Sequence, residues 1–268
     1  MALIHQPNNA KIMRALLLGF AALAPLIAIL LIGTHIAFAL APVFVSHLLL
    51  LYATLVPNCQ WWGPVATRFQ TTEREVWITI DDGPSPEHTN KMLDVLEQFH
   101  ARATFFVVGA LGEKHPHLIT EILARGHTLA NHTHTHPSWS FWCASPGRVR
   151  AEIDRGAEQL RTTADRPARF FRAPAGLKNV FVHPALERRG LALIGWTVRG
   201  LDTVQRDPAR VAERIEKGAA PGAIILLHEG KRTEREADFN PRCLELTLQR
   251  LTARGYRFVI PPPEQLRA

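Results

Sequence analysis

The sequence predicts an α/β domain preceded by an N-terminal membrane hairpin. No charged residue occurs between Arg14 and Arg68. From Val76 onward, short apolar runs rich in β-branched residues alternate with runs of helical periodicity. Strands that alternate with helices pair in parallel, and both a barrel and a doubly wound sheet satisfy this pattern. Polar clusters recur where the predicted strands end, and this is where barrel folds build their sites.

The composition is that of a folded protein. Of the 268 residues, 47% are hydrophobic and 21% are charged, which excludes a disordered, highly charged tail protein. The formal net charge is +7. No stretch interleaves basic residues with stacking aromatic ones, so we expect no nucleic-acid partner and a positive surface suited to phosphate-bearing substrates or anionic lipid. Cys59, Cys143 and Cys243 form no CxxC pair, and the sequence leaves their pairing open.

The uncharged segment 15–57 is expected to anchor the chain in a membrane. As one helix, residues 15–56 would reach about 63 Å, twice the ~30 Å hydrocarbon core. We therefore predict two spans, Ala15–Gly33 and Ile36–Val56, joined by a turn at Gly33-Thr34-His35. The chain then divides into a short basic N-terminus (1–14), the anchor (15–57), a linker (58–74) and a globular domain (75–268).

A cleaved signal peptide is the rival interpretation of this segment. Lys11 and Arg14 would form its basic region, and Ala39-Leu40-Ala41 resembles a cleavage site. About 26 apolar residues precede that site, well beyond the usual 7–15, and Pro42 follows it.

Basic residues flank both ends of the hairpin, which favours the cytoplasm for both ends of an anchor in the bacterial cytoplasmic membrane. A single span with the remainder lying in the interface is the alternative.

Each element of the globular domain follows from local signals. Gly126 and Gly190 end two helices, and Ser145-Pro146 and Asp207-Pro208 begin two others. The run Ala223–Leu227 is apolar throughout, as in a strand buried on both faces. The predicted strands are Val76–Ile80, Ala103–Val108, His127–Asn131, Arg169–Arg172, Leu191–Val198, Ala223–Leu227 and Tyr256–Ile260. The predicted helices are Thr89–Phe99, Pro116–Arg125, Ser145–Thr163, Pro184–Arg189, Asp207–Lys217 and Pro241–Arg254.

Two strand ends carry a candidate metal site. Asp81 and Asp82 follow the first strand, where adjacent carboxylates are costly unless a cation neutralises them, although an Asp-Asp-Gly-Pro turn is the simpler explanation. His132 and His136 are four residues apart, so a helical turn would point both imidazoles to one side and His134 away. Two histidines and one carboxylate suit a catalytic Zn²⁺ or a related divalent ion.

Further polar residues follow the later strands. Arg172 precedes the loop Pro174-Ala175-Gly176, where a backbone N–H could be exposed. The fifth strand leads through Trp196 to Asp202, and His228 emerges from the apolar sixth strand. Each signal is weak by itself, and their common position at strand ends makes them candidate site residues.

The ordered motifs resemble one family. Asp81-Asp82-Gly83-Pro84, His132-Thr133-x-x-His136, Arg172-x-Pro174-x-Gly176, Asp202 and Leu226-x-His228 are similar to the motifs of the polysaccharide deacetylases, the NodB homology domain or carbohydrate esterase family 4. The resemblance extends from Glu75 to Ile260. It implies a distorted (β/α) barrel of about seven strands and a metal-dependent hydrolase that removes the N-acyl group from an amino sugar in a poly- or oligosaccharide.

The resemblance also implies a role for each residue. Asp82, His132 and His136 would bind the metal, most simply Zn²⁺, with Co²⁺, Mn²⁺ and Ni²⁺ as alternatives. Asp81 would be the general base, positioned by Arg172. His228 would be the general acid, oriented by Asp202. The N–H of Ala175 would hold the oxyanion. Independently of the resemblance, Trp139 and Trp196 are candidate sugar contacts, and Trp139, Phe141 and Trp142, which follow the histidine motif, could either stack on a sugar or pack in the core.

Three positions depart from the family pattern. Members usually carry Tyr where Ala175 stands, Asp where Arg199 stands and Trp where Thr203 stands, which leaves the substrate open. One alternative is a deacylase or deformylase of an amino sugar linked to a lipid carrier, which the hairpin and the positive surface favour. Another is an inactive, membrane-anchored sugar-binding protein. The family resemblance places the domain outside the cytoplasm, against the charge pattern.

Overall fold

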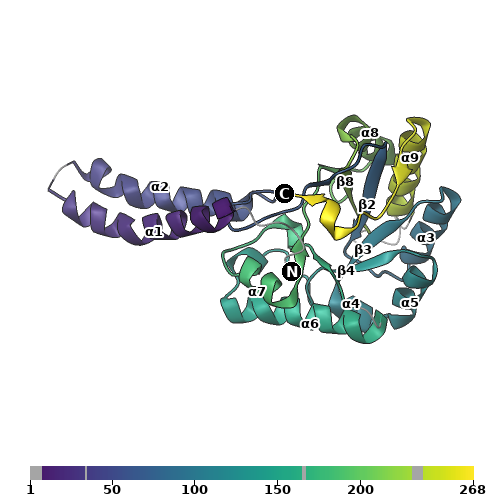
Figure 1. Cartoon of the computed structure of the whole chain (residues 1–268), viewed down its shortest axis with the longest axis horizontal. Helices are drawn as coiled ribbons and strands as arrows, with labels where there is room; N and C mark the ends of the chain where they lie inside the picture. Colours follow the sequence, from purple (N-terminus) through teal and green to yellow (C-terminus); the bar gives the residue numbers. More distant parts are fainter. Residues whose placement is uncertain (1–7, 34, 165–166, 231–237) are drawn as a thin grey trace.

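In the computed structural model, a long helical hairpin projects from a globular domain (Figure 1). The structure describes residues 8–33, 35–164, 167–230 and 238–268. The hairpin consists of α1 (Asn8–Leu30) and α2 (Ile36–Leu55), so α1 begins within the expected basic N-terminus. Thr34, part of the predicted turn, lies outside the described residues.

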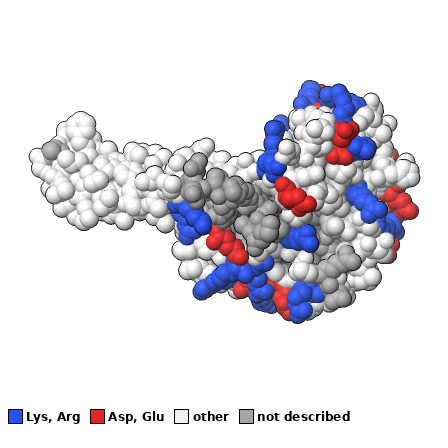
Figure 2. Space-filling model, viewed as in Figure 1, with Lys and Arg blue, Asp and Glu red and all other residues white. Residues whose placement is uncertain are grey.

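Both hairpin helices are long and apolar enough to cross a membrane. The helices run side by side, and both of their domain-proximal ends lie on the same side, with the connecting turn at the far tip (Figure 1). The face of the hairpin shown in Figure 2 carries no Lys, Arg, Asp or Glu away from the domain. The fold therefore has the predicted hairpin followed by an α/β domain.

The domain is built on one sheet of short strands, mostly parallel. The order is β10-β1-β8-β2-β3-β4-β5-β6, with β7 also paired to β8 and β9 to β2. β1 pairs antiparallel with β8 and β10, and the other strand pairs are parallel. The strands are β1 (Arg68–Phe69), β2 (Glu75–Asp81), β3 (Ala103–Val107), β4 (Thr128–Asn131), β5 (Phe170–Phe171), β6 (Ala192–Leu193), β7 (Val198–Arg199), β8 (Ala223–His228), β9 (Arg257–Phe258) and β10 (Leu266–Arg267).

Residues just before β1 close the sheet into a distorted barrel. Ala66 bridges to Ile194, which follows β6 at one end of the sheet, and Phe69 belongs to β1 near the other end. Ala66 and Phe69 are buried. Part of the segment 58–74, expected to be a linker, thus belongs to the barrel.

Helices cover the outside of the sheet (Figure 1). Asp207 caps α8 by accepting a hydrogen bond from the N–H of Ala209, as the sequence indicates. Gly190 ends α7 in the left-handed conformation. The helices are α3 (Thr89–Gln98), α4 (Gly109–Lys114), α5 (Pro116–Ala124), α6 (Pro146–Ala164), α7 (Val182–Arg189), α8 (Pro208–Gly218) and α9 (Phe239–Ala253), with 3₁₀ turns η1 (Phe141–Cys143), η2 (Pro174–Gly176) and η4 (Pro263–Gln265).

Two differences from the sequence prediction lie within the region 75–260. The predicted strand Leu191–Val198 is split into β6 and β7. Between them, the carbonyls of Ile194 and Gly195 accept hydrogen bonds from the guanidinium of Arg172, at 3.3 and 2.8 Å, in place of ladder bonds. The six-residue helix α4 was not predicted, because its segment is too short to show helical periodicity.

The two-residue period of the strands directs the site residues into the barrel. In β2, Val76, Ile78 and Ile80 pack in the outer core with α3 and α9, whereas Trp77 packs in the inner core. The inward set continues to Asp81. The same alternation places three further polar residues on the inward face. His132 is two residues after the inward Ala130 of β4, Arg172 is two residues after Phe170 of β5, and His228 is four residues after Ile224 of β8. The four strand ends therefore deliver polar side chains to one mouth of the barrel.

Candidate active site

Asp82, His132 and His136 form one compact cluster. One ligand atom from each residue lies within 4.8 Å of the other two. His132 Nε2 is 3.4 Å and His136 Nε2 is 3.1 Å from Asp82 Oδ1. Burial by itself raises the pKa of Asp82, but a hydrogen bond with His132 and the nearby charges of His228, His132 and His136 hold it well below its usual range. The carboxylate is therefore ionised and ready to bind a cation.

The second ring nitrogens of the two histidines have partners of their own. His132 Nδ1 lies 2.8 Å from the backbone carbonyl of Arg172, which can only accept, so Nδ1 carries a proton and Nε2 is the nitrogen that would bind a metal. His136 Nδ1 lies 3.0 Å from Ser138 Oγ. Metal-binding histidines are usually held in this way. This donor set fits a divalent ion, and two imidazoles with one carboxylate are typical of catalytic zinc.

The histidine motif is an irregular loop, which corrects the predicted helical turn. Thr133 and His136 have φ of 66° and 53°, in the left-handed region. Glu152 of α6 holds the loop by accepting hydrogen bonds from the backbone N–H groups of His134 and Thr135, at 3.0 and 2.8 Å. His134 lies outside the metal cluster, as expected, and its Nδ1 is 3.9 Å from Glu113 Oε1.

Asp81 is held by a buried arginine. Arg172 Nη1 donates to Asp81 Oδ1 at 2.6 Å and to Thr79 Oγ1 at 2.9 Å. The guanidinium lies over the ring of Phe106, 4.1 Å from its centroid. Burial lowers the pKa of Arg172 and the charge of Asp81 opposes that shift, so the group stays protonated. The other carboxylate oxygen of Asp81 is 3.7 Å from His132 Nε2, at the edge of the metal cluster.

His228 and Asp202 form a second pair at the same mouth. Asp202 accepts from the backbone N–H of His228 at 2.7 Å and from its Nδ1 at 2.9 Å, which leaves Nε2 for the substrate. Burial favours the neutral imidazole, but the charge and hydrogen bond of Asp202, aided by Asp82 and Asp81, raise the pKa of His228 to about 9. In the metal-free protein His228 is therefore protonated at neutral pH.

The loop after β5 contributes Ala175. Its φ of 53° is in the left-handed region, and the residue is exposed. The N–H groups of Gly176 and Leu177 are used by the carbonyls of Ala173 and Pro174, at 2.8 and 3.0 Å. The loop packs closely against Trp196. A Cβ added to Gly176 would lie only 2.6 Å from the indole ring, so this position has no room for a side chain.

The two tryptophans occupy different environments. Trp196 is buried, and the centroid of its ring is 6.0 Å from the guanidinium carbon of Arg172. It therefore packs behind the site residues and is not exposed to a substrate. Trp139 is 93% exposed and is available for stacking on a sugar. Phe141, by contrast, is a fully buried core residue.

The end of the helical hairpin contacts the Ala175 loop. Lys178 is fully buried, and its ammonium donates to the carbonyls of Val56 and Pro57, at 3.2 and 2.7 Å, where α2 ends. Asn58 Nδ2 donates to the carbonyl of Trp196 at 2.9 Å. Burial lowers the pKa of Lys178 to about 8. The hairpin is thus packed directly against the Ala175 loop.

Sequence reasoning missed Glu152, Lys178 and a third supporting residue, Glu229. Glu229 is buried, burial raises its pKa to about 8, and Thr89 donates to its Oε2 at 2.7 Å. A Cβ on Gly83 would lie 1.6 Å from Glu229 Oε1, so this carboxyl packs directly under the Asp82-Gly83 turn. Glu229 directly follows His228 in the sequence, and this adjacency is the feature from which its place beside the site could have been predicted. In the described part of the chain, Cys59, Cys143 and Cys243 form no disulfide.

Comparison with known proteins gives consistent relatives. The family model described as polysaccharide deacetylase matches residues 69–194. A chitooligosaccharide deacetylase of Bradyrhizobium sp. (strain ANU 289) is 35% identical over 189 residues, which is 70% of this chain and 84% of that protein. A peptidoglycan-N-acetylglucosamine deacetylase of Bacillus cereus is 30% identical over 199 residues, which is 74% of this chain and 91% of that protein.

Solved structures show the same fold. The Bc1960 peptidoglycan N-acetylglucosamine deacetylase matches with a TM-score of 0.65 at 29% identity, over 73% of this chain and 89% of that one. A family 4 carbohydrate esterase from Streptomyces lividans matches with a TM-score of 0.64 at 24% identity, over 72% and 96%. The sequence match to the first relatives, taken with this fold, shows that the chain belongs to the polysaccharide deacetylase family.

Proposed function

We propose that the chain is a metal-dependent hydrolase that removes the N-acetyl group from an amino sugar of a glycan. The observation that carries the proposal is the meeting of three groups at one barrel mouth: the Asp82–His132–His136 cluster, the Arg172-bound Asp81 and the Asp202-bound His228. The named relatives act on chitooligosaccharides and peptidoglycan. Zn²⁺ is the metal we propose; when bound, it would polarise the amide carbonyl and acidify water.

Asp81 is the general base in this proposal. It removes a proton from the attacking water. Arg172 holds one oxygen of Asp81 at 2.6 Å, which fixes the orientation of the carboxylate. The other oxygen lies at the edge of the metal cluster, 3.7 Å from His132 Nε2. A carboxylate held beside a cation site is positioned for this proton transfer.

His228 is the general acid. Amide cleavage requires a proton on the departing amine, because an amide anion is a very poor leaving group. His228 is protonated at neutral pH and presents Nε2, while Asp202 fixes the ring through Nδ1. The backbone N–H of Ala175 donates to the oxyanion that develops on the carbonyl oxygen.

A lipid-linked amino sugar is a second candidate substrate, favoured by one observation. Lys178 ties the Ala175 loop to the carbonyls of Val56 and Pro57, directly after α2. If the hairpin lies in the cytoplasmic membrane, the barrel mouth is close to the lipid headgroups. A sugar carried on a lipid would then reach the site without leaving the membrane surface.

An acetate-release assay tests the proposal. The purified full chain, loaded with Zn²⁺, is incubated with N-acetylglucosamine oligomers and, separately, with a lipid-linked N-acetylated sugar. We expect acetate and free amine in equal amounts from at least one of them, and loss of both on chelation with recovery on adding metal back. No release from either substrate under metal-loaded conditions would reject the proposal.

A further inference from the structure

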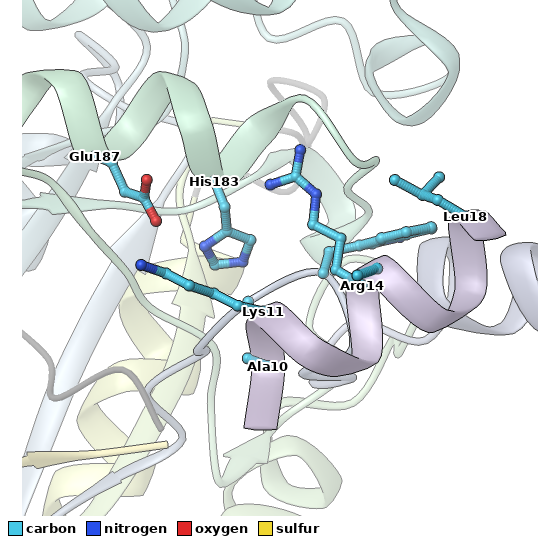
Figure 3. Close-up of a pocket in the computed structure, with 9 residues that line it drawn as sticks. Ala10, Lys11, Arg14, Leu18, His183 and Glu187 are labelled. Carbon is cyan, nitrogen blue, oxygen red and sulfur yellow. The ribbon is translucent and has the colours of Figure 1, made fainter. Parts of the chain in front are cut away.

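A pocket lies where the hairpin meets the domain, between α1 and α7, and is distinct from the catalytic mouth. Its volume is about 330 Å³. Figure 3 shows Lys11, Arg14 and Leu18 reaching from α1, with His183 and Glu187 on α7 across from them. Trp62, which follows the hairpin, completes the wall. The volume is at the lower end of the range for small-ligand sites.

The pocket is positively charged. Among its described lining residues are two cations, Lys11 and Arg14, and one carboxylate, Glu187, so the lining charge is 2 − 1 = +1. Lys11 is exposed and Arg14 is half-buried. Within the described ranges, neither cation has a carboxylate within salt-bridge distance. Guanidinium and ammonium groups together are the usual partners of phosphate oxygens.

His183 is a second, independent indication that this pocket binds a ligand. The residue is only 5% exposed, and its ring is pressed against Gly63, where a Cβ would come within 2.4 Å of the ring carbon Cγ. Its Nε2 has no hydrogen-bond partner among the residues that the structure describes. Burial, with the charges of Lys178 and Arg14, lowers the pKa of His183 to about 3, so the neutral ring can donate one hydrogen bond to an anion.

The position of the pocket suggests which anion it takes. Lys11 and Arg14 stand at the polar end of α1, and the exposed apolar face of this helix continues from Leu18 toward the tip. Tyr52 and Trp61, whose ring centroids are 4.8 Å apart, lie near the end of α2, where aromatic side chains mark a membrane interface. A ligand with a phosphate at Arg14 and an acyl chain along Leu18 would match both parts of the pocket.

We propose that this pocket binds the phosphate group of an anionic membrane phospholipid. Arg14 and Lys11 contact the phosphate oxygens, and His183 Nε2 donates to one of them. Leu18 and Trp62 pack against the first carbons of the acyl chains. Because the pocket joins α1 to α7, a bound lipid fixes the domain relative to the membrane plane. Inorganic phosphate shares the headgroup chemistry but lacks the apolar part.

Lipid binding to the full chain in detergent tests this proposal. The protein is titrated with phosphatidylglycerol, phosphatidylcholine or inorganic phosphate, and bound lipid is counted by native mass spectrometry while the melting temperature is recorded. We expect phosphatidylglycerol to bind and to raise the melting temperature, and the other two to have little effect. Arg14→Gln should weaken phosphatidylglycerol binding about tenfold or more, as expected for loss of a charge-assisted hydrogen bond.

Arg188→Gln is the matched control. Arg188 is an exposed cation on α7 that directly follows Glu187 in the sequence, and it does not line the pocket. This variant should bind phosphatidylglycerol like the wild type, and the lipid-free melting temperature of both variants reports that they fold. Equal binding by Arg14→Gln and Arg188→Gln would overturn the proposal. Equal stabilisation by phosphatidylcholine or by inorganic phosphate would overturn the assignment to an anionic lipid.

Discussion

Asp81 and His228 are direct register partners on the neighbouring parallel strands β2 and β8. Both side chains follow the inward-facing set of their strands, so the proposed base and the proposed acid enter the barrel mouth side by side. Asp81 is the last residue of β2 and His228 is the last residue of β8. The separation between the two proton-transfer groups is therefore fixed by sheet register, the most rigid feature of the fold.

The first prediction concerns the metal. His132→Ala and His136→Ala should each lower the affinity for Zn²⁺ by more than the roughly 10–100-fold lost when a hydrogen-bond partner of a metal ligand is removed, because each removes a ligand itself. His134→Ala should retain the metal, since His134 lies outside the cluster. Metal content of the purified variants after dialysis measures this. Full occupancy in His136→Ala would refute the assigned ligand set.

The second prediction concerns pH. Asp202 raises the pKa of His228 by its charge and hydrogen bond, so Asp202→Asn should lower that pKa. The acid form of His228 is then lost at a lower pH, and the alkaline limb of the kcat profile shifts toward acid. A pH–rate profile of both proteins compares the limbs. An unshifted alkaline limb in Asp202→Asn would rule out His228 as the acid.

The third prediction concerns the contact between the anchor and the site. Lys178→Met leaves the carbonyls of Val56 and Pro57 without their donor, and each unsatisfied buried group costs ~1–3 kcal/mol. We expect a lower melting temperature and a lower kcat, because the Ala175 loop loses its tether. Lys217→Met, at a side chain that is 74% exposed, is the control. Identical behaviour of the two variants would show that the contact has no role.

The fourth prediction concerns topology. The two domain-proximal ends of the hairpin lie on the same side (Figure 1). The basic residues Lys11 and Arg14 lie beside α7 of the domain (Figure 3). The positive-inside tendency then places the domain in the cytoplasm. Alkaline phosphatase fused after Ala268 should be inactive, and a fluorescent protein at the same place should fluoresce. An active phosphatase would place the domain outside and contradict the prediction.

Much of the fold could be predicted from local signals. The strand at residues 76–80 and the helix at 89–99 match β2 and α3 to within a residue or two, because an apolar run marks the strand and helical periodicity marks the helix. The two-residue strands β1 and β10 could not be predicted, since they form only by pairing with distant residues. The split of the predicted strand 191–198 follows from Arg172, a contact across sequence that periodicity does not reveal.

The site was predictable where residue type and order carry the chemistry, and not where tertiary packing does. Asp81, Asp82, His132 and His136 stand together as the motifs indicated. The loop geometry of the histidines was predicted wrongly, because the loop's backbone N–H groups donate hydrogen bonds to Asn131 and to Glu152 of α6, and the loop has left-handed residues at Thr133 and His136. Glu152 and Lys178 lie in ordinary-looking sequence, and only their burial beside the site shows what they support.

The most direct test of the central claim is the turnover of Asp81→Asn on the substrate that the wild type deacetylates, with the metal content of both proteins measured. Asn keeps the size of the side chain and removes its basicity, and Asp82, His132 and His136 are untouched. The account predicts normal Zn²⁺ content, a KM close to that of the wild type, and a kcat lowered by about 10²–10⁴-fold, the usual contribution of a general base. Near-normal kcat in the metal-loaded variant would contradict the account.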